Sequence, residues 1–139
     1  MTNRFDDLSI NVTVAYYIDF EDSNILNILL ANNISSDGVG VTETDAATAT
    51  LTASMFMNDV SITSFNTFNY FTKANNNPNE SLFRNCTNFA SINLSNVTKL
   101  SNHEFRGSGL TSVVIPEGIE YIPESCFYGC SQLSSVVLP

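Results

Sequence analysis

Basic side chains are scarce in this sequence. Lys and Arg together number 5 against 14 Asp and Glu, so the formal net charge is −9. Nucleic-acid-binding proteins displace counterions with clusters of Lys and Arg, and anionic membranes attract the same residues. The sequence contains no such cluster. We therefore expect neither a nucleic-acid partner nor binding to an anionic membrane.

Long apolar runs and targeting signals are also missing. No run of about 18 apolar residues, the length that can span a bilayer, occurs in the sequence. We therefore expect no membrane insertion. Residues 1–8 lack the basic start and apolar centre of a signal peptide. On this ground we expect the protein to be made and assembled inside a cell, or to have had a leader removed.

Residues suited to catalysis or metal binding are few. The single histidine, His103, precedes Glu104, and we interpret the two as a surface pair because no nucleophile stands at motif spacing. The cysteines are odd in number and lack zinc-ligand spacing, so we interpret Cys86, Cys126 and Cys130 as small buried apolar groups. The sequence therefore predicts no enzyme, no catalytic residue, no metal and no cofactor.

The last third of the sequence contains a repeat. An aromatic residue is followed by a small residue and then by aliphatic residues, in copies that begin at Phe83, Phe105 and Phe127. The three phenylalanines stand 22 residues apart both times, and a period in the low twenties is typical of leucine-rich-repeat solenoids. If the copies stack as coils, these rings form one column. The expected repeat core consists of Phe83, Phe89, Ile92, Leu94, Phe105, Leu110, Val113, Ile115, Phe127, Leu133, Val136 and Leu138.

The third copy resembles the BspA-type leucine-rich repeat, whose pattern runs roughly A-F-x-x-C-x-x-L-x-x-I-x-L-P. Residues 126–139 match it almost completely, with Cys126 in place of the usual small Ala. The second copy has Ser108 for the cysteine and is one residue short, the first has Phe89 for the leucine, and a weaker copy lies in residues 56–72. The resemblance implies a solenoid with a binding or structural role. Such repeats occur in bacterial surface proteins, protozoan surface antigens and phage appendages, so fold alone does not decide the function.

The first third has a different pattern. Residues 8–20 alternate between apolar and polar side chains, which predicts a strand. Residues 21–23 can cap a helix over about 23–33. A capping box at residues 42–45 predicts a second helix over about 43–54. We therefore expect three elements before the repeats begin.

The expected fold is α+β, with a small N-terminal strand-plus-two-helix region followed by a short leucine-rich-repeat solenoid. The N-terminal docking or capping region covers residues 1–55, and the repeats cover residues 56–139. The repeats comprise an opening rung at 56–81, repeats at about 82–104 and 105–126, and an incomplete repeat at 127–139. Because no polar capping segment follows Pro139, we expect the chain to continue or a partner to cover this end.

One face of the predicted N-terminal strand is apolar. It can be the inner face of an ordinary half-buried strand, or it can pair with another protein chain. The candidate docking residues are Ile10, Val12, Val14, Tyr16 and Ile18.

A weaker candidate site lies just after the first predicted helix. Asn33, Ser35 and Asp37, followed by Gly38, stand where related segments can carry a calcium loop. The carboxylate that should close such a loop is absent, with Thr44 in its place. We interpret this stretch as a plain turn.

The sequence predicts a non-enzymatic structural or binding protein. The leading reading is a phage virion component, such as the N-terminal part of a tail fibre or another appendage, whose N-terminus anchors to the particle while the repeats project. Its expected partners are other virion proteins, further copies of itself and a receptor on the host surface. The alternative is a bacterial cell-surface adhesin or protein-interaction domain of the same repeat type. A third reading is an intracellular scaffold that uses the Ser and Asn side chains of the repeat strands.

Overall fold

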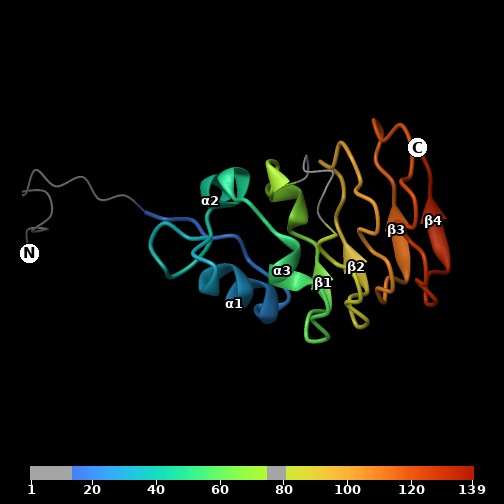
Figure 1. Ribbon diagram of the computed structural model, residues 1–139. Helices are drawn as coiled ribbons and strands as arrows, with labels where there is room; N and C mark the ends of the chain where they lie inside the picture. The colour runs from blue at the N-terminus through green and yellow to red at the C-terminus, as the bar shows by residue number, and fades with distance from the viewer. Residues whose placement is uncertain (1–13, 75–80) are drawn as a thin grey trace, which may run out of the picture.

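The computed structural model describes residues 14–74 and 81–139. Short helices lie at one end of the molecule, and coils that carry parallel strands follow one after another toward the other end (Figure 1). The elements are α1 (Ser23–Ala31), α2 (Glu43–Thr48), α3 (Ala53–Phe56), β1 (Ser64–Phe65), the 3-10 helix η1 (Phe68–Tyr70), β2 (Ser91–Ile92), β3 (Ser112–Val114) and β4 (Ser135–Val137). The prediction of mixed helix and strand content is therefore confirmed.

Helix α1 begins at the cap that the sequence predicted. Asp22 Oδ1 accepts the backbone N–H of Asn24 at 2.9 Å, as an N-cap side chain does. The other oxygen, Oδ2, accepts the backbone N–H of Thr63 at 2.6 Å and that of Ser64 at 3.4 Å. Burial opposes ionisation of this carboxyl group, but the hydrogen bonds outweigh it and lower the pKa of Asp22. One carboxylate thus joins the start of α1 to the start of β1.

The second predicted helix is divided in two. Thr42 and Asp45 form the expected capping box, but α2 ends at Thr48 instead of continuing to residue 54. The Thr48 hydroxyl donates to Thr44 O at 3.0 Å, a contact that competes with regular helix geometry. Ala49 then adopts an extended conformation, with φ −61° and ψ 140°, and Leu51 is buried beyond it. The extended step places Leu51 in the core, and the chain becomes helical again at α3.

The predicted strand over residues 8–20 is wrong for the part that the structure describes. Residues 14–20 form no strand, and their only pairing is an isolated antiparallel bridge between Tyr17 and Thr42. The neighbouring backbone allows no longer ladder, because the segment that pairs with Tyr17 enters α2 at residue 43. Residues 8–13 lie outside the described residues. The alternation therefore does not mark a sheet: Val14 and Tyr16 are exposed, and Ile18 and Phe20 are half-buried against the core.

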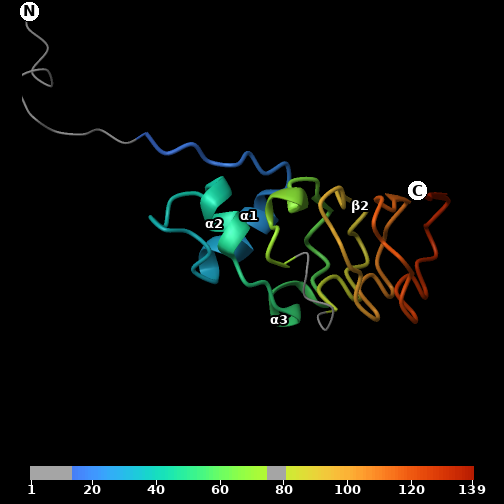
Figure 2. The ribbon, with the colours of Figure 1, turned by 90° about the horizontal axis from the view of Figure 1, so that it is seen from above.

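The repeats stack as the 22-residue period predicted. The Phe83 and Phe105 rings lie 5.7 Å apart at an interplanar angle of 5°, and the Phe105 and Phe127 rings lie 5.4 Å apart at 9°. Phe56 adds a tilted ring 5.5 Å from Phe83. Seen from above, each coil follows its neighbour along one direction (Figure 2). The prediction of one phenylalanine column is confirmed.

Backbone hydrogen bonds join the coils on two sides. On the strand side, β1 pairs in parallel with β2, and β3 pairs in parallel with β4. On the opposite side, the Phe105 N–H donates to Cys126 O at 2.9 Å and the Gly107 N–H donates to Tyr128 O at 2.8 Å. These bonds hold the two edges of neighbouring coils in register, so the coils cannot slide past each other.

Burial of the expected repeat core decreases toward the last described coil. Seven of the expected residues are buried, namely Phe83, Phe89, Leu94, Phe105, Leu110, Val113 and Ile115. Ile92, Phe127 and Leu133 are half-buried against this core. Val136 and Leu138 are 44% and 64% exposed, although the equivalent Val113 and Ile115 are buried. The difference arises because no described residue packs on the outer face of the coil that carries β4.

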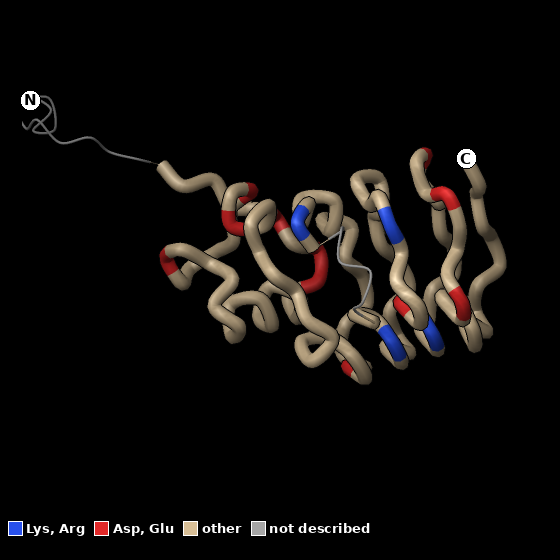
Figure 3. Tube along the Cα trace, turned by 45° about the horizontal axis from the view of Figure 1, so that its top comes forward, with Lys and Arg blue, Asp and Glu red and all other residues tan. Residues whose placement is uncertain are grey.

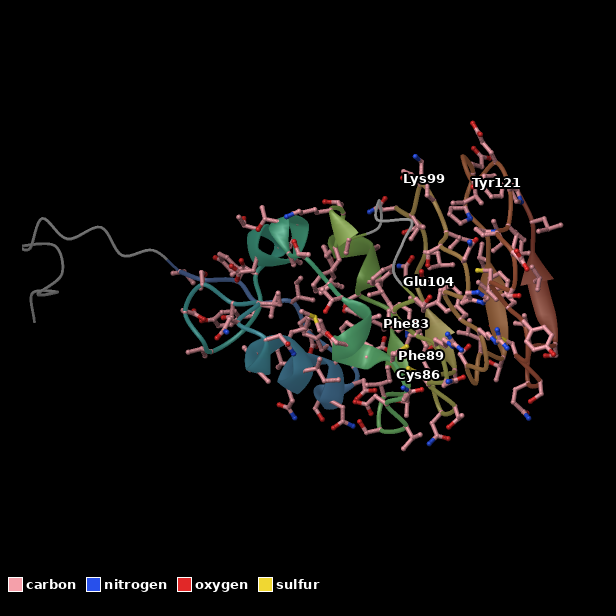
Figure 4. All side chains as sticks on the ribbon, viewed as in Figure 1. Phe83, Cys86, Phe89, Lys99, Glu104 and Tyr121 are labelled. Carbon is pink, nitrogen blue, oxygen red and sulfur yellow. The ribbon has the colours of Figure 1, made fainter. Side chains whose placement is uncertain are left out.

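The cysteines occupy structural positions between coils. Cys86 lies beside Phe83 and Phe89 (Figure 4), and its thiol donates to Phe56 O at 3.0 Å. The Cys130 thiol donates to Phe105 O at 2.9 Å. Burial raises the pKa of Cys86 to about 11 and that of Cys126 to about 12. These two thiols stay protonated at neutral pH, so they serve as packing groups and not as nucleophiles, and that of Cys86 is also a weak donor.

Candidate binding face

The outward side chains of the strands form rows of serines, asparagines and valines. In the two parallel pairs, Ser64 is opposite Ser91 and Ser112 is opposite Ser135. Two residues further along each strand, a second row consists of Asn66, Asn93, Val114 and Val137. Side chains two apart lie on the same face of a strand. We call this surface, made of the four serines and the second row, the strand face.

None of the residues of the strand face is charged, and the Glu21 carboxylate contacts the face at Asn66. Residues 60–72, 87–98, 107–116 and 125–139 contain no Asp, Glu, Lys or Arg, and each range includes one strand. The charged residues of the repeats lie instead on the segments that connect the strands (Figure 3). A surface of hydroxyl, amide and methyl groups can hydrogen-bond a partner without the cost of removing water from an ion.

The sheet divides between β2 and β3. The Thr111 N–H still donates to Ala90 O at 3.2 Å where these strands begin, but β2 and β3 belong to separate two-stranded sheets. A groove of about 580 Å³ opens there, lined by Asn66, Asn93, Leu94, Ser95, Val114 and Pro116 among others. This volume is within the range of about 300–1,000 Å³ found for ligand pockets. The groove therefore interrupts the strand face near its middle.

The coil that carries β3 reaches its strand by a shorter path than either neighbouring coil, although β3 still pairs with β4. Phe105 and Val113 are eight positions apart, whereas Phe83 and Ile92 are nine. Gly109 permits this shorter path, because a Cβ atom there would lie 2.2 Å from Thr87 O. The missing residue is restored after the strand, where Gly118 turns with a φ of 93°. The two coils therefore match at the phenylalanine column and diverge beyond the strands.

The two asparagines beside the groove are each held by one hydrogen bond. Asn93 Oδ1 accepts the Ser95 N–H at 3.0 Å, and Asn66 Nδ2 donates to Glu21 Oε2 at 2.7 Å. Within residues 14–74 and 81–139, the other amide atom of each side chain has no hydrogen-bond partner. Asn93 thus offers a donor and Asn66 an acceptor at the groove, which is the pair of functions that a peptide group requires.

The candidate docking residues are placed in different ways. Val14 and Tyr16 are 63% and 81% exposed, at the end of the molecule opposite β4 (Figure 1). Ile18 is half-buried against the core, and its N–H donates to Val41 O at 2.8 Å. Ile10 and Val12 lie outside the described residues. Sequence reasoning assigned all five residues one role, but the structure separates Ile18 from the two exposed residues.

The pair formed by His103 and Glu104 is not a surface pair. Glu104 is 7% exposed and accepts a hydrogen bond from the hydroxyl of buried Ser101. Glu104 also adds to the raised pKa of Cys126, after the larger effect of burial. His103 adopts a left-handed conformation with a φ of 61°. The prediction was wrong because it considered neighbours in sequence, whereas the coil turns Glu104 inward.

Asp37 belongs to a turn, as the sequence suggested. Its Oδ1 accepts the Val39 N–H at 2.8 Å and the Ser35 hydroxyl at 3.1 Å, and its Oδ2 accepts the Tyr17 hydroxyl at 2.5 Å. These bonds, that from Tyr17 above all, lower the pKa of Asp37 to about 2. Tyr17 and Asp37 therefore attach the segment before α1 to the turn before α2.

Metal-ligand clusters and membrane-spanning helices are both absent from the described part of the chain. Residues 14–74 and 81–139 contain no cluster of three or more His, Cys, Asp or Glu side chains that could hold a metal ion. No helix within the same ranges combines the length and the apolar character needed to cross a bilayer.

Comparison with known proteins gives one match. The family model described as "BspA type Leucine rich repeat region (6 copies)" matches residues 49–139. The match begins directly after α2 and includes every described strand. No curated protein and no solved structure matches the chain.

Proposed function

Because the chain belongs to the BspA-type leucine-rich-repeat family, which generally serves as a non-enzymatic binding domain, we propose that it holds an uncharged protein segment against its strand face. The uncharged residues of that face carry the proposal. A charged partner would leave its ions unpaired against these uncharged residues, whereas an extended neutral segment can hydrogen-bond to the serines and asparagines. The repeats form the rigid solenoid that presents these groups in fixed rows.

We further propose that the protein is part of a phage virion appendage. The separation of two surfaces supports this assignment. Exposed Val14 and Tyr16 lie at the helical end, and the strand face extends over the coils at the other end (Figure 1). One end can then attach to a particle while the other contacts a host receptor. The alternative is a bacterial cell-surface adhesin that uses the same strand face.

Locating the protein distinguishes these two roles. Purified phage particles and cell-envelope fractions from the source are analysed by mass spectrometry. Peptides of this chain at a fixed copy number in particles support the appendage, and enrichment in the envelope supports the adhesin. Absence from both fractions contradicts both roles.

Variants on the strand face test how the protein binds. Ser112→Arg introduces a charge between β2 and β4 and should abolish attachment of the purified protein to host cells. Asn102→Arg introduces the same charge on an exposed turn of the preceding repeat and should leave attachment unchanged. Equal attachment of Ser112→Arg and the unmodified protein would exclude the strand face as the binding surface.

A double variant tests the helical end. Val14→Ser with Tyr16→Ser should prevent incorporation into particles without loss of the fold, because both side chains are exposed. Normal incorporation would contradict the anchoring role. Removal of residues 1–20 is a poorer test, since Tyr17 and Ile18 contact the body of the protein.

A further inference from the structure

A second groove lies farther along the opening between the same two coils. It is lined by Thr98, Lys99 and Leu100 of one coil and by Ile119, Glu120 and Tyr121 of the next, and its volume is about 610 Å³. Lys99 and Tyr121 stand at the same edge of the molecule (Figure 4). We call it the return groove, because these segments lead back from the strands to the phenylalanine column.

The return groove has a structural cause. Leu94 and Val97 are three positions apart in the first coil, whereas the equivalent Ile115 and Ile119 are four apart in the next. The extra residue moves the second segment away from the first. Accordingly, Val97 is 4% exposed and buried in the core, whereas Ile119 is only partly buried. The opening is therefore built into the repeat lengths.

The chemistry of the lining selects among ligand classes. Lys99 can only donate hydrogen bonds and Glu120 can only accept them, and their charges cancel. An anion would meet Glu120 in a chain of net charge −9, and a cation would meet Lys99. A purely apolar ligand would remove water from both ions without replacing its hydrogen bonds. The lining therefore favours a neutral ligand whose groups both donate and accept.

Tyr121 further restricts the class of ligand that fits the return groove. Tyr121 lines the groove and is 72% exposed, so much of its aromatic side chain is accessible to a ligand. The C–H face of a pyranose ring is flat and apolar, and the hydroxyl groups at its edge both donate and accept. The volume lies within the range of about 300–1,000 Å³ for ligand sites and has room for about two or three such rings.

We propose that the return groove binds a short neutral oligosaccharide, stacked on Tyr121 and hydrogen-bonded by Lys99 and Glu120. This site is distinct from the strand face, and it would allow one coil boundary to hold a glycan as well as a protein segment. The proposal does not depend on the protein being an appendage or an adhesin, because it follows from the lining residues alone.

Titration of the purified chain with defined sugars tests the proposal. Maltotriose, cellotriose and triacetylchitotriose are added while amide and side-chain NMR signals are observed. At least one trisaccharide should shift signals of residues 98–100 and 118–121. Binding by none of the three at about 10 mM, a concentration that would reveal even weak affinity, would overturn the proposal.

Variants identify the site. Tyr121→Ala should weaken binding about tenfold through loss of the stacked ring, and Tyr121→Phe should retain most of the affinity. Glu120→Gln should weaken binding several-fold because an amide is a weaker acceptor than a carboxylate. Tyr128→Ala, which removes another exposed tyrosine, is the control and should bind as the unmodified chain does. Equal loss in Tyr121→Ala and Tyr128→Ala would refute the assignment.

A charged sugar tests the neutral class. Lactose and 3′-sialyllactose differ by one acidic residue, and lactose should bind at least as tightly. Tighter binding of 3′-sialyllactose that is lost in Lys99→Gln would show an anion site and overturn the proposal. Attachment of Ser112→Arg to host cells is a separate measurement. A wrong assignment of the strand face and a wrong assignment of the return groove therefore give different results.

Discussion

Replacement of Asp22 by Ala should loosen the junction between the helices and the repeats. The carboxylate is 8% exposed and accepts hydrogen bonds from Asn24 on one oxygen and from Thr63 and Ser64 on the other. Loss of the cap costs about 1 kcal/mol. Loss of charge-assisted bonds on the second oxygen costs roughly 1.5–3 kcal/mol. The free energy of unfolding at pH 7 should therefore fall by about 2.5–4 kcal/mol in total.

This loss should depend on pH in a defined direction. The pKa of Asp22 is lowered from its ordinary 3.8 by its hydrogen bonds, against the opposing effect of burial. A group whose pKa is lowered on folding stabilises the folded state above the unfolded value, and this contribution is lost as pH falls through the folded value. The difference between Asp22→Ala and the unmodified chain should therefore be largest above pH 3.8 and shrink below it.

Urea unfolding followed by circular dichroism measures both effects. Asp19→Ala is the matched control, because Asp19 is an exposed carboxylate three residues away. At pH 7 the free energy of unfolding of Asp22→Ala should lie about 2.5–4 kcal/mol below that of the unmodified chain, and that of Asp19→Ala should be nearly unchanged. Equal stability of the two variants, or a loss for Asp22→Ala that stays constant from pH 7 to pH 2.5, would refute the reasoning.

The remaining predictions concern the core, two turns and a thiol. Phe105→Ala should cost about 3–5 kcal/mol in unfolding free energy, because it removes the ring between two stacked neighbours; a cost below about 1 kcal/mol in urea unfolding would contradict the column. Gly109→Ala should lower the melting temperature, since its Cβ would clash with the backbone of Thr87. An unchanged melting temperature would contradict this clash, because it would show that the coil can make room for the methyl group. Tyr17→Phe should raise the pKa of Asp37 from about 2 toward 3.8 in an NMR titration. The stabilisation that the Asp37 carboxylate contributes above pH 3.8 should then be lost at a higher pH in the variant than in the unmodified chain as the solution is acidified. An unchanged pKa would exclude the Tyr17 hydroxyl as the cause of the low value. Cys86 should react with a thiol reagent at pH 8 only after urea unfolding, because burial raises its pKa to about 11; rapid labelling of the folded chain would contradict this burial.

Much of the repeat architecture could be predicted from the sequence. The phenylalanines repeat at a constant interval, and each apolar position that repeats with them faces the same interior in every coil. Ser108 could likewise be predicted to share the position of Cys86 and Cys130, and the Ser108 hydroxyl indeed lies 3.5 Å from the Cys130 thiol. Caps also depend on nearby residues, which is why Asp22 and the box at Thr42 were found correctly.

The candidate sites were less predictable. Ser91, Asn93, Ser112 and Ser135 were noted from the sequence as hydrogen-bonding groups of the strands, but Ser64 and the grooves beside them were not. The return groove accompanies a difference in local length between two coils, and the spacings of Leu94 to Val97 and of Ile115 to Ile119 contain that signal. Whether such a difference opens a groove depends on which neighbouring strand each strand pairs with. That pairing is set by hydrogen bonds between coils. The prediction of an N-terminal strand was wrong for a related reason, because an alternating pattern does not show whether a partner strand is present.

The sequence by itself determined that successive coils share one core, because a repeated pattern of apolar residues buries itself only by stacking on its own copies. The tertiary structure alone decided where β2 and β3 separate, how Asp22 reaches residues forty positions away, and that Glu104 turns inward. These features depend on contacts between segments far apart in the chain, and on differences of a single residue between neighbouring coils. No local pattern contains both members of such a contact.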